Sequence, residues 1–438
     1  MLKVVKFGGS SVAGADQFQK VKNIVLSDPS RRVVVVSAAG KRSSDDHKLT
    51  DLLYLCHAHL TYGVPCDAIL QTIQDRFVEI RESLGLAYDV EGDFAALRAT
   101  LSRSTTADEL VSRGEYFTAR LMAEYLGFDF VDAADCVFFG YDGQFDLEKT
   151  YDAIQQAASR GKGIVMPGFY GSLPSGKVKC MTRGGSDISG ALAAAAIGAD
   201  VYENWTDVSG ILMADPRIVK DPAPIQYITY NELRELAFMG ASVLHEDSVQ
   251  PVKDKGIPLN IRNTNRPEDP GTMIVEKIEK KSVDQDRFIT GIAGRRNFTI
   301  LTLRKREMNI NQTLPQMLKI LDRAKVPAEH ITLGLDSFAV VVSSDTLGDQ
   351  LYQVVGDIQS TCAPDDLQVQ DDVALVAVVG RKMTYRPGTA GKIFQSLGQH
   401  GINIRTINQA ADEISITVGV DNKDFEAAIR VLYDGFAG

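Results

Sequence analysis

The amino-acid sequence predicts an α/β protein in which a mostly parallel sheet lies between helical layers, followed by two smaller α+β modules of the ferredoxin-like type. Two features carry this prediction. In roughly the first 280 residues, short β-branched runs end in glycine-bearing turns and alternate with longer helical segments, as in a parallel sheet covered on both faces. Beyond about residue 290, strand-like and helix-like segments follow the order β-α-β-β-α, and this order occurs twice.

The strands expected in the first part of the chain are short and largely apolar. They lie at 2–7 (LKVVKF), 33–37 (VVVVS), 163–166 (GIVM) and 200–205 (DVYENW). Strands of this kind are buried on both faces, so the helices between them must cover the sheet. The composition changes past Asn263, where NTNRPEDPGT concentrates prolines and asparagines and a lysine-rich stretch follows. We therefore expect one large α/β domain over residues 1–280.

Two similar modules are expected after that boundary, over residues 289–362 and 370–438. The first combines a strand, a helix, two strands and a helix, at 299–304, 314–324, 330–334, 338–343 and 346–358. The second repeats this order at 374–379, 388–399, 402–408, 414–419 and 423–433. The repeat is one of pattern more than of identity, with about seventy residues in each copy.

Composition places the 438-residue chain among ordinary globular proteins, with 44% hydrophobic and 24% charged residues. These fractions exclude a disordered, collagen-like or membrane-spanning chain. The formal net charge of -10 and the pI of about 5.2 oppose attraction to nucleic acid or to an anionic membrane surface. The N-terminus reaches Gly8-Gly9 before a signal-like apolar stretch is complete, so we expect a cytoplasmic protein.

Cysteine and histidine spacing gives no sign of a metal site. The five cysteines are scattered, with no C-x-x-C pair, which indicates reduced thiols and not a disulfide framework or a zinc site. His57 and His59 are two residues apart on an expected helix, where such residues do not share a face. No structural metal is therefore expected.

The first candidate site is Lys6-Phe7-Gly8-Gly9-Ser10, where a strand ends and a helix begins. Two glycines let the backbone approach a ligand closely. The freed N–H groups and the helix dipole then form an anion site, to which Lys6 adds a positive charge. Taken alone, the motif is equally compatible with a plain strand-to-helix turn that carries a surface lysine. Neither a Walker A spacing nor a dinucleotide fingerprint is present.

Three further clusters place ionisable residues at expected helix starts or strand ends. Thr182-Arg183-Gly184-Gly185-Ser186-Asp187 precedes a helix of small residues and suits the binding of an anion, while its acid orients a metal or a lysine. Glu115 opens another helix, and Thr206-Asp207 lies in a strand-end loop. Each cluster also has a purely structural interpretation. Residues 182–187 could be a capped helix start, Glu115 a first-turn carboxylate favoured by the helix dipole, and Thr206-Asp207 a simple turn.

In combination, these motifs resemble the aspartokinase family within the amino-acid kinase superfamily. They are KFGGSSVA, VVVVSAAGK with KLTDLL, SRGE, TRGGSDISGALAAAAIGAD and WTDVSGILMADPR, in that order. The C-terminal duplicate is similar to the paired ACT regulatory modules of that family, with VVGRKMTYRPGTAGKIFQSLGQHGINI as its best-matching stretch. The resemblance covers essentially the whole chain and implies the amino-acid kinase fold followed by two ACT modules.

The resemblance implies a monofunctional aspartate kinase. Such an enzyme uses ATP and Mg²⁺ to phosphorylate the side-chain carboxylate of L-aspartate, giving 4-phospho-L-aspartate, the first step of the lysine, threonine and methionine pathway. An aspartate side chain with a pKa near ~3.9 is already ionised at pH 7, so no general base is needed. Catalysis is then positioning plus positive charge, which we expect from Lys6, the Gly8-Gly9 amides and Mg²⁺. No fused homoserine dehydrogenase is expected, because a further nucleotide fingerprint is missing.

Residue roles follow from similarity to the family. Glu115 is expected to bind the α-ammonium group of aspartate, Arg183 its α-carboxylate, and Asp187 to organise Lys6 and the metal-phosphate region. The remaining residues expected in the aspartate pocket are Ser37, Thr50, Gly184 and Ser186. The residues expected to contact the nucleotide are Lys6, Gly8, Gly9, Ser10, Thr206, Asp207, Leu212, Arg217, Ser242 and Val243. The catalytic set is Lys6, Asp187, Gly8 and Gly9, with no protein-borne metal cluster.

The kinase part departs from the family pattern at two places. Ser242 stands where many members carry a nucleotide-contacting lysine, and Glu246 stands where a proline is usual, which puts ATP contact there in doubt. The loop that precedes Thr50 is longer than in some relatives, so Lys41 and Lys48 are candidates to supply the missing charge.

The ACT part departs at its first copy, which lacks the glycine that usually opens an ACT helix, whereas the second copy has Pro387-Gly388. Family effectors commonly bind at the first copy in an ACT-ACT dimer. We therefore expect a homodimer through the ACT modules, with feedback inhibition altered or absent. The effector, whether lysine, threonine or neither, stays open, as does the strand pairing between the copies. In this family a strand near 289–295 completes the second copy.

Two other functions stay open. A kinase for another acid, such as N-acetylglutamate, is disfavoured by Glu115, because an acetylated amine carries no charge to pair with it. An amino-acid-sensing protein whose kinase half has lost activity is disfavoured because Lys6, Arg183 and Asp187 are all present.

Overall fold

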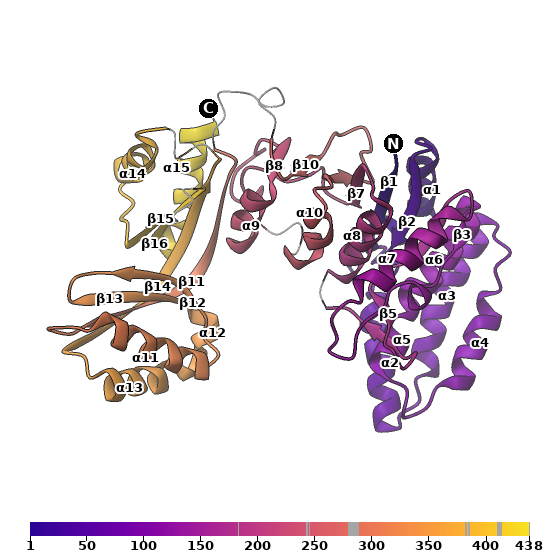
Figure 1. The fold of residues 1–438 in the computed structure, drawn as a ribbon, viewed down its shortest axis with the longest axis horizontal. Helices are drawn as coiled ribbons and strands as arrows, with labels where there is room; N and C mark the ends of the chain where they lie inside the picture. The colour runs from indigo at the N-terminus through magenta and orange to yellow at the C-terminus, as the bar shows by residue number, and fades with distance from the viewer. Residues whose placement is uncertain are drawn as a thin grey trace. The chain divides into compact units, whose positions relative to one another are not determined.

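The computed structural model describes residues 1–182, 184–241, 244, 246–278, 289–381, 383, 386–409 and 414–437 (Figure 1). By the contacts between its residues, the chain divides into two compact units. The first contains Met1–Ile211, Pro224–Tyr230 and Val243–Glu279, and the second contains Leu212–Ala223, Asn231–Ser242 and Lys280–Gly438.

The first unit is built on an eight-stranded sheet with the order β3-β4-β2-β1-β7-β9-β10-β8. Its strands are β1 (Lys3–Phe7), β2 (Arg31–Val36), β3 (Asp129–Phe130), β4 (Ile164–Pro167), β7 (Val201–Thr206), β8 (Tyr227–Thr229), β9 (Leu259–Asn263) and β10 (Thr272–Val275). Pairing is parallel throughout except between β9 and β10. A short hairpin of β5 (Tyr170–Ser172) and β6 (Val178–Cys180) lies outside this sheet. The predicted mostly parallel sheet is confirmed, with each of its four expected strands shifted by one to two residues at an end.

Helices cover both faces of this sheet, as predicted. One face carries α1 (Ala15–Leu26) and α6 (Arg113–Leu126), packed in one hydrophobic core with α2 (Leu49–Tyr62), α3 (Asp67–Leu84), α4 (Val90–Thr100) and α5 (Ala107–Val111). The other face carries α8 (Gly185–Ile197), against which α7 (Leu147–Ser159) and α10 (Gln250–Asp254) pack. The small residues of α8 allow this approach: a Cβ on Gly190 would lie 2.3 Å from the Tyr202 hydroxyl oxygen.

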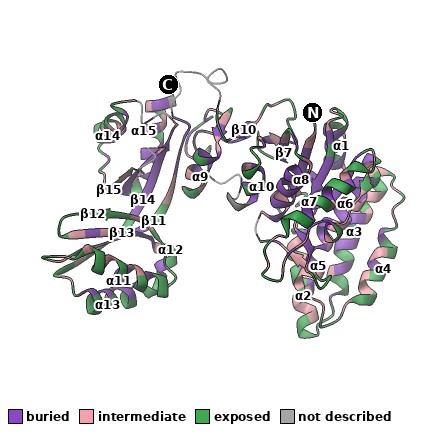
Figure 2. Cartoon of the chain, in the orientation of Figure 1, coloured by how far each residue is buried: buried purple, intermediate pink, exposed green. Residues whose placement is uncertain are grey.

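The strands send alternate side chains to the two faces, and Figure 2 shows them buried. In β1, Val5 and Phe7 belong to the core beneath α1 and α6. Lys6, between them in sequence, points to the opposite face and meets α8. The period of two therefore decides which polar strand residues meet which helices.

The second unit is built on a six-stranded antiparallel sheet with the order β12-β13-β11-β14-β16-β15. Its strands are β11 (Gly291–Arg304), β12 (Ala328–Leu333), β13 (Ser337–Ser343), β14 (Asp366–Val379), β15 (Thr406–Gln409) and β16 (Ser415–Asp421). Its helices include α11 (Ile310–Arg323), α12 (Ser344–Leu347), α13 (Leu351–Cys362), α14 (Thr389–Gln399) and α15 (Phe425–Ala437). The doubled β-α-β-β-α pattern is confirmed.

Two strands of this sheet are much longer than the sequence predicted. The β11 segment from Gly291 to Arg295 pairs with the end of β14, and the segment from Phe298 to Arg304 pairs with β13 and the start of β14. The strand expected near 289–295 therefore exists and joins the second copy. Helix α11 also begins four residues earlier than expected, at Ile310, and β15 is shorter, because helix and strand ends depend on tertiary contacts that periodicity does not report.

Two segments that precede residue 280 belong by their contacts to the second unit. Helix α9 (Tyr230–Phe238) carries the buried Glu232, whose carboxylate accepts hydrogen bonds from Arg381 Nε at 3.1 Å and from the Thr290 hydroxyl. The backbone N–H of Ala223 donates to the Tyr433 hydroxyl at 2.9 Å. The units defined by contacts are therefore not continuous in sequence, unlike the domains that the sequence predicted. The domain bounds 1–280, 289–362 and 370–438 stay predictions.

Within the described ranges, no helix is long and apolar enough to cross a membrane. All five cysteines are free thiols.

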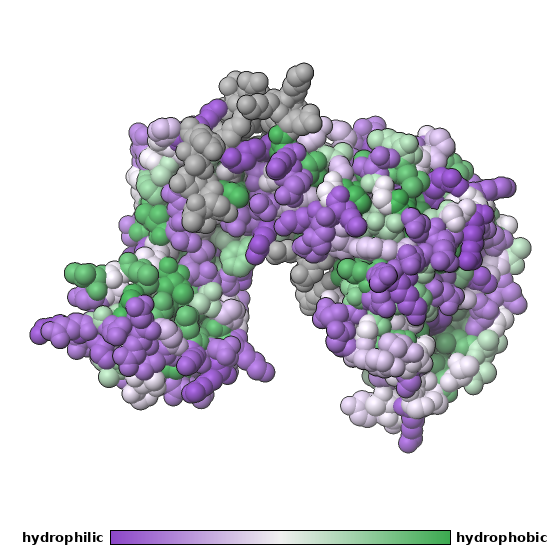
Figure 3. Space-filling view, in the orientation of Figure 1, coloured by the Kyte–Doolittle hydropathy of each residue, from purple (hydrophilic) through white to green (hydrophobic). Residues whose placement is uncertain are grey.

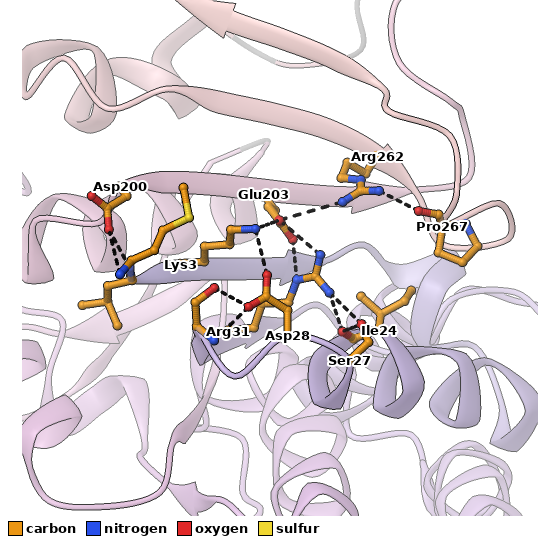
Figure 4. A network of polar contacts seen from close by, with 12 residues as sticks. Lys3, Ile24, Ser27, Asp28, Arg31, Asp200, Glu203, Arg262 and Pro267 are labelled. Atoms are coloured by element: carbon orange, nitrogen blue, oxygen red, sulfur yellow. Dashed lines mark hydrogen bonds and ion pairs between the residues drawn. The ribbon is translucent and has the colours of Figure 1, made fainter.

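A buried cluster of charges stabilises the first unit on the face of the sheet opposite α8 (Figure 4). Glu203 of β7 accepts hydrogen bonds from Arg31 Nε at 2.8 Å and from the Trp205 indole N–H at 2.9 Å. The Lys3 ammonium lies 3.2 Å from the same carboxylate and 2.9 Å from Asp28. One carboxylate thus neutralises cations from β1 and β2 and ties three adjacent strands together.

The pKa of Glu203 reflects this pairing. Burial alone would raise it, but the hydrogen bond from Arg31 and the charges of Arg31 and Lys3 lower it below its ordinary value. Glu203 therefore stabilises the fold above the pKa of about 4.5 that it has when unfolded, and this stabilisation is lost as the pH falls through its lower pKa in the folded protein.

We expect Glu203→Gln to lower the free energy of unfolding by about 3 kcal/mol at pH 7, because Arg31 stays buried without its counter-charge and Lys3 keeps only Asp28. Denaturant unfolding followed by the fluorescence of Trp205, the single tryptophan, measures this directly. Glu91→Gln, which removes an exposed partner of Arg81, is the control and should leave the free energy of unfolding nearly unchanged. The gap between wild type and Glu203→Gln should narrow below pH 4.5; a gap independent of pH would contradict this account.

Candidate active site

The candidate site lies at the edge of the sheet where β1, β2, β4 and β7 end. Because these strands are parallel neighbours, the loops that follow them meet at this edge. The loops begin at Gly8, Ser37, Gly168 and Asp207. The starts of α6 and α8 complete the site with Glu115 and Asp187.

Lys6 and Asp187 form a close ion pair at this edge, with Lys6 Nζ 2.5 Å from Asp187 Oδ1. The same oxygen accepts a hydrogen bond from Asn204 Nδ2 at 2.8 Å, and the Tyr202 hydroxyl donates to the Asp187 carbonyl at 3.1 Å. Lys6 is buried, and strand alternation puts Lys6, Tyr202 and Asn204 on the α8 face. The arrangement holds the Lys6 ammonium group in a fixed position beside Gly8-Gly9, which we call the glycine loop.

The glycine loop runs directly alongside that ammonium group. A Cβ on Gly8 would lie 3.7 Å from Lys6 Nζ, and one on Gly9 would lie 3.0 Å from the Ala38 carbonyl oxygen. A Cβ on Gly40 would stand only 2.5 Å from the carbonyl carbon of Gly9. The close approach of the two backbone segments therefore leaves no room for a side chain at Gly40 and little at Gly9, whereas a Cβ on Gly8 would make only ordinary contacts.

Three backbone N–H groups hold the segment after β2 in place. Ser37 donates to the Phe7 carbonyl at 3.1 Å, and Gly40 donates to the Gly9 carbonyl at 2.8 Å. Between them, Ala39 donates to the Thr118 hydroxyl at 3.1 Å. The backbone N–H of Ala38 lowers the pKa of the neighbouring Glu115 carboxyl group. The segment thus joins the glycine loop to the start of α6.

Glu115 is buried where α6 meets this segment. The approach requires Gly114, on which a Cβ would lie 2.9 Å from that of Ala38. Burial raises the pKa of Glu115 to about 8, although the Ala38 N–H and the Arg113 charge oppose the shift. Its Oε2 has no hydrogen-bond partner among the described residues. A cationic ligand would supply the counter-charge that the ionised form of this carboxyl group lacks.

The start of α8 forms the other wall. Gly184 has a φ of +77° and no side chain caps the helix, so the first N–H groups of α8 are left for an anionic ligand. A Cβ on Gly168 would lie 2.8 Å from Ser186 Cα, which brings the loop after β4 against this helix. Phe169, at a φ of +77°, donates its N–H to Ser189 Oγ at 3.0 Å. Arg183, predicted to bind the α-carboxylate, lies outside the described residues.

The remaining predicted residues are spread more widely. Ser37 and Thr50 are half-buried, the first directly after β2 and the second in the first turn of α2. Ser10 is exposed in a single turn of 3₁₀ helix, and the Thr206 hydroxyl donates to Asp207 at 3.1 Å. Lys41 and Lys48 are both exposed.

Four nucleotide-contact predictions fall outside the first unit or outside the described residues. Leu212 and Arg217 belong by their contacts to the second unit. The Arg217 side chain is 88% exposed and donates to the Asp215 carboxylate at 2.6 Å. Ser242 and Val243 lie outside the described residues.

Sequence reasoning missed Asn204 and Thr118, which fix Asp187 and the Ala39 N–H. A signal existed for Asn204, because a buried strand has little reason to carry an amide unless a partner satisfies it. Thr118 gave no signal, since a threonine within a helix is ordinary.

Comparisons with known proteins agree with this geometry. The model of the amino acid kinase family matches residues 1–263, and an ACT domain model matches residues 376–436. Aspartokinase 3 of Bacillus subtilis is 32% identical, over 99% of this chain and 98% of that protein.

Solved structures are similar over the full length. The aspartate kinase of Clostridium acetobutylicum is 42% identical, with a TM-score of 0.92 over 99% of both chains. Aspartokinase III of Escherichia coli is 27% identical over 100% of both chains. Its complex with aspartate and ADP, called the R-state, has a TM-score of 0.76, and its complex with lysine and aspartate, the T-state, has one of 0.75.

The raised pKa of Glu115 predicts a pH-dependent cost to stability. Between the pKa of about 4.5 that Glu115 has when unfolded and about 8, the folded protein binds the extra proton, so stability falls as the pH rises through this window and then levels off. We expect Glu115→Gln to remove this fall, which is of the order of a few kcal/mol. Unfolding free energies at pH 5, 7 and 9 test it, with the exposed Glu148→Gln as control. Parallel pH profiles for wild type and Glu115→Gln would rule the shift out.

Proposed function

The chain belongs to the aspartokinases of the amino acid kinase family, and from that membership and the site we propose that it transfers the γ-phosphoryl group of ATP to the side-chain carboxylate of L-aspartate. The product is 4-phospho-L-aspartate, which opens the route to lysine, threonine and methionine. The observation that carries the proposal is the Lys6-Asp187 pair beside the glycine loop, at the same sheet edge as the buried Glu115. The aspartate and ADP complex of the Escherichia coli enzyme supports it.

The chemistry requires charge neutralisation more than proton transfer. A carboxylate nucleophile is ionised at neutral pH, and the obstacle is its approach to a polyanionic phosphate. Lys6 is held by Asp187 and Asn204, so its ammonium group is already oriented before substrates bind. The Gly8 and Gly9 backbone, without side chains, lets phosphate oxygens come close to that charge. The catalytic set is therefore Lys6, Asp187, Gly8 and Gly9.

Recognition of aspartate rests on its two backbone charges. Glu115 binds the α-ammonium group, and Arg183 binds the α-carboxylate. Because its pKa is near 8 in the free protein, Glu115 releases a proton as the ammonium group arrives. Ser37, Thr50, Gly184 and Ser186 complete the aspartate pocket. N-acetylglutamate is the less favoured substrate, because its acetylated amine carries no charge to pair with Glu115.

The residues of the site fit a magnesium ion that arrives with the nucleotide. Among the described residues no group of three or more His, Cys, Asp and Glu side chains gathers to hold a metal. Mg²⁺ is usually held by one or two carboxylates together with phosphates, and Asp187 and Asp207 are the carboxylates that would face it. When bound, the ion supplies positive charge to the phosphate oxygens. The nucleotide contacts proposed are Lys6, Gly8, Gly9, Ser10, Thr206, Asp207, Leu212, Arg217, Ser242 and Val243.

Regulation is assigned to the ACT modules, proposed over 289–362 and 370–438 after a catalytic domain over 1–280. Lysine is the effector favoured, because the Escherichia coli relative was solved with lysine in its T-state. Threonine stays an alternative. The helix of the first module begins at Ile310 without an opening glycine, so feedback inhibition is expected to be altered or absent. The protein is proposed to work in the cytoplasm.

A homodimer is proposed to form through the ACT modules. Strand β12 is an edge strand, and an exposed row of apolar side chains runs along it and the turn that follows: Ile331, Leu333 and Leu335. Figure 3 shows hydrophobic side chains over the region that Figure 1 labels β12 and β13. An apolar edge of this kind is stable when a second copy covers it.

Hydroxylamine trapping of the acyl phosphate tests the reaction. L-aspartate, L-glutamate and N-acetyl-L-glutamate are compared side by side with ATP and Mg²⁺, with and without lysine or threonine. Product from aspartate alone is expected. If folded protein binds ATP but gives no product with any acid, the amino-acid-sensing function takes its place.

We expect Lys6→Ala to lower kcat by roughly 100- to 1000-fold while the KM for aspartate changes less than about threefold, because its charge matters most in the transition state. Steady-state kinetics by the same trapping assay give both values. Lys20→Ala, which removes a lysine bound only to Asn265, is the matched control and should leave both unchanged. An unchanged kcat for Lys6→Ala would remove this residue from the mechanism.

We expect Leu333→Asp to convert the dimer to monomer, since Leu333 is 60% exposed on the β12 edge and the substitution places a charge in an apolar contact. Light scattering after size-exclusion chromatography measures the mass. Leu147→Asp, at an exposed leucine of α7, should stay dimeric. A dimeric Leu333→Asp protein would locate the interface elsewhere.

A further inference from the structure

We propose that Arg76 is a positioning residue of the phosphoryl-transfer site, which holds Gly40 against Gly9 from the buried face of α3. This inference rests on the proposed function, because it concerns how the loops of that site are fixed. Arg76 was not among the residues that the sequence singled out. Its hydrogen bonds go to Gly40 and His47, which belong to neither of the motifs that carry Lys6 and Asp187.

Arg76 is an unusual residue for its place, in the middle of an 18-residue helix and with a side chain only 4% exposed. Burial lowers the pKa of its guanidinium, although the neighbouring carboxylate of Asp46 opposes this. A helix core position would ordinarily carry an apolar residue. A buried arginine at such a position is therefore expected to serve the partners that it binds.

The partners of Arg76 all come from one short segment of chain. Nη1 donates to the His47 carbonyl at 2.9 Å, and Nη2 donates to the Gly40 carbonyl and lies 3.3 Å from the Asp46 carboxylate. One rigid guanidinium thus binds both ends of the segment from residue 40 to residue 47. Its planar fork makes this double contact possible, which a single ammonium group does not.

Through Gly40, Arg76 is connected to the glycine loop by a single further hydrogen bond. Gly40 has its carbonyl bound by Arg76 and its N–H bound to the carbonyl of Gly9 at 2.8 Å. As a glycine it has no side chain of its own to hold it in place. Its position against Gly9 therefore depends on these two hydrogen bonds and on its neighbours in the chain.

Through His47, Arg76 also holds the segment that leads into helix α2. Helix α2 begins at Leu49, and the proposed aspartate residue Thr50 lies in its first turn. Arg76 consequently fixes the spacing between the glycine loop and the start of α2. In phosphoryl transfer that spacing matters, because a misplacement near 1 Å can cost about 100-fold in rate.

Arg42 provides a matched comparison on the same segment. It also binds Asp46, at 3.1 Å, and it binds Glu79 of α3 at 2.7 Å. Its side chain is 43% exposed, and these contacts are with carboxylates and not with the Gly40 or His47 carbonyls. Arg42 therefore lies among the same charged groups as Arg76 but does not bind the Gly40 and His47 carbonyls.

Steady-state kinetics of Arg76→Met, Arg76→Lys and Arg42→Met in the full chain test the proposal. We expect Arg76→Met to lower kcat by roughly 10- to 100-fold and to raise the KM for MgATP, and Arg42→Met to match wild type within about twofold. Arg76→Lys keeps the charge but cannot bridge both carbonyls, so it should recover thermal stability more than kcat. Wild-type kinetics for Arg76→Lys would overturn the proposal.

Gly40→Ala approaches the same contact from the other side and serves if Arg76→Met fails to fold. Its Cβ forces Gly9 away, so kcat should fall and the affinity for ADP, measured by titration calorimetry, should weaken, with a smaller effect on the KM for aspartate. Normal kcat and ADP affinity in folded Gly40→Ala would overturn the proposal. Failure of the proposed function is distinct, because wild type itself would then give no acyl phosphate.

Discussion

The site depends on the close approach of two backbone segments that leave neighbouring parallel strands. Gly8-Gly9 follows β1, and residues 37–40 follow β2, and their backbones lie nearer than side chains would permit. Three of the four N–H groups of the second segment, those of Ser37, Ala39 and Gly40, are bound to the surrounding elements. Lys6, Glu115 and the start of α6 take their positions from this arrangement, so the anion-binding and ammonium-binding parts of the site share one backbone support.

Strand alternation separates two polar clusters that would otherwise compete. On the α8 face, Lys6 and Asn204 meet Asp187 and form the site. On the other face, Glu203 neutralises Arg31 and the neighbouring cations within the core. The residues of β7 that serve these two purposes are adjacent in sequence, and the pleat alone sends them apart. Strand β7 therefore contributes Asn204 to the site and Glu203 to the core, and the two charged clusters stay separate.

Much of this could be predicted from the sequence. The parallel sheet and the doubled C-terminal pattern were expected, because apolar strand runs and glycine-bearing turns are local features. That Asp187 organises Lys6 was expected from the resemblance to the aspartokinase family. The lengths of β11 and β14 were not, since a long antiparallel pairing depends on the partner strand. Asn204 and Arg76 were missed for a related reason: their roles depend on contacts with residues far away in the chain.

By itself, the sequence determined the fold class, the order of the elements and the residue types of the site. These follow from periodicity, turn chemistry and motif order, which are read along the chain. Only the tertiary structure decided that Glu115 is buried with a raised pKa, that Gly40 lies against Gly9, and that segments before residue 280 pack with the C-terminal unit. Burial and close approach are properties of distant segments brought together, and no local pattern contains them.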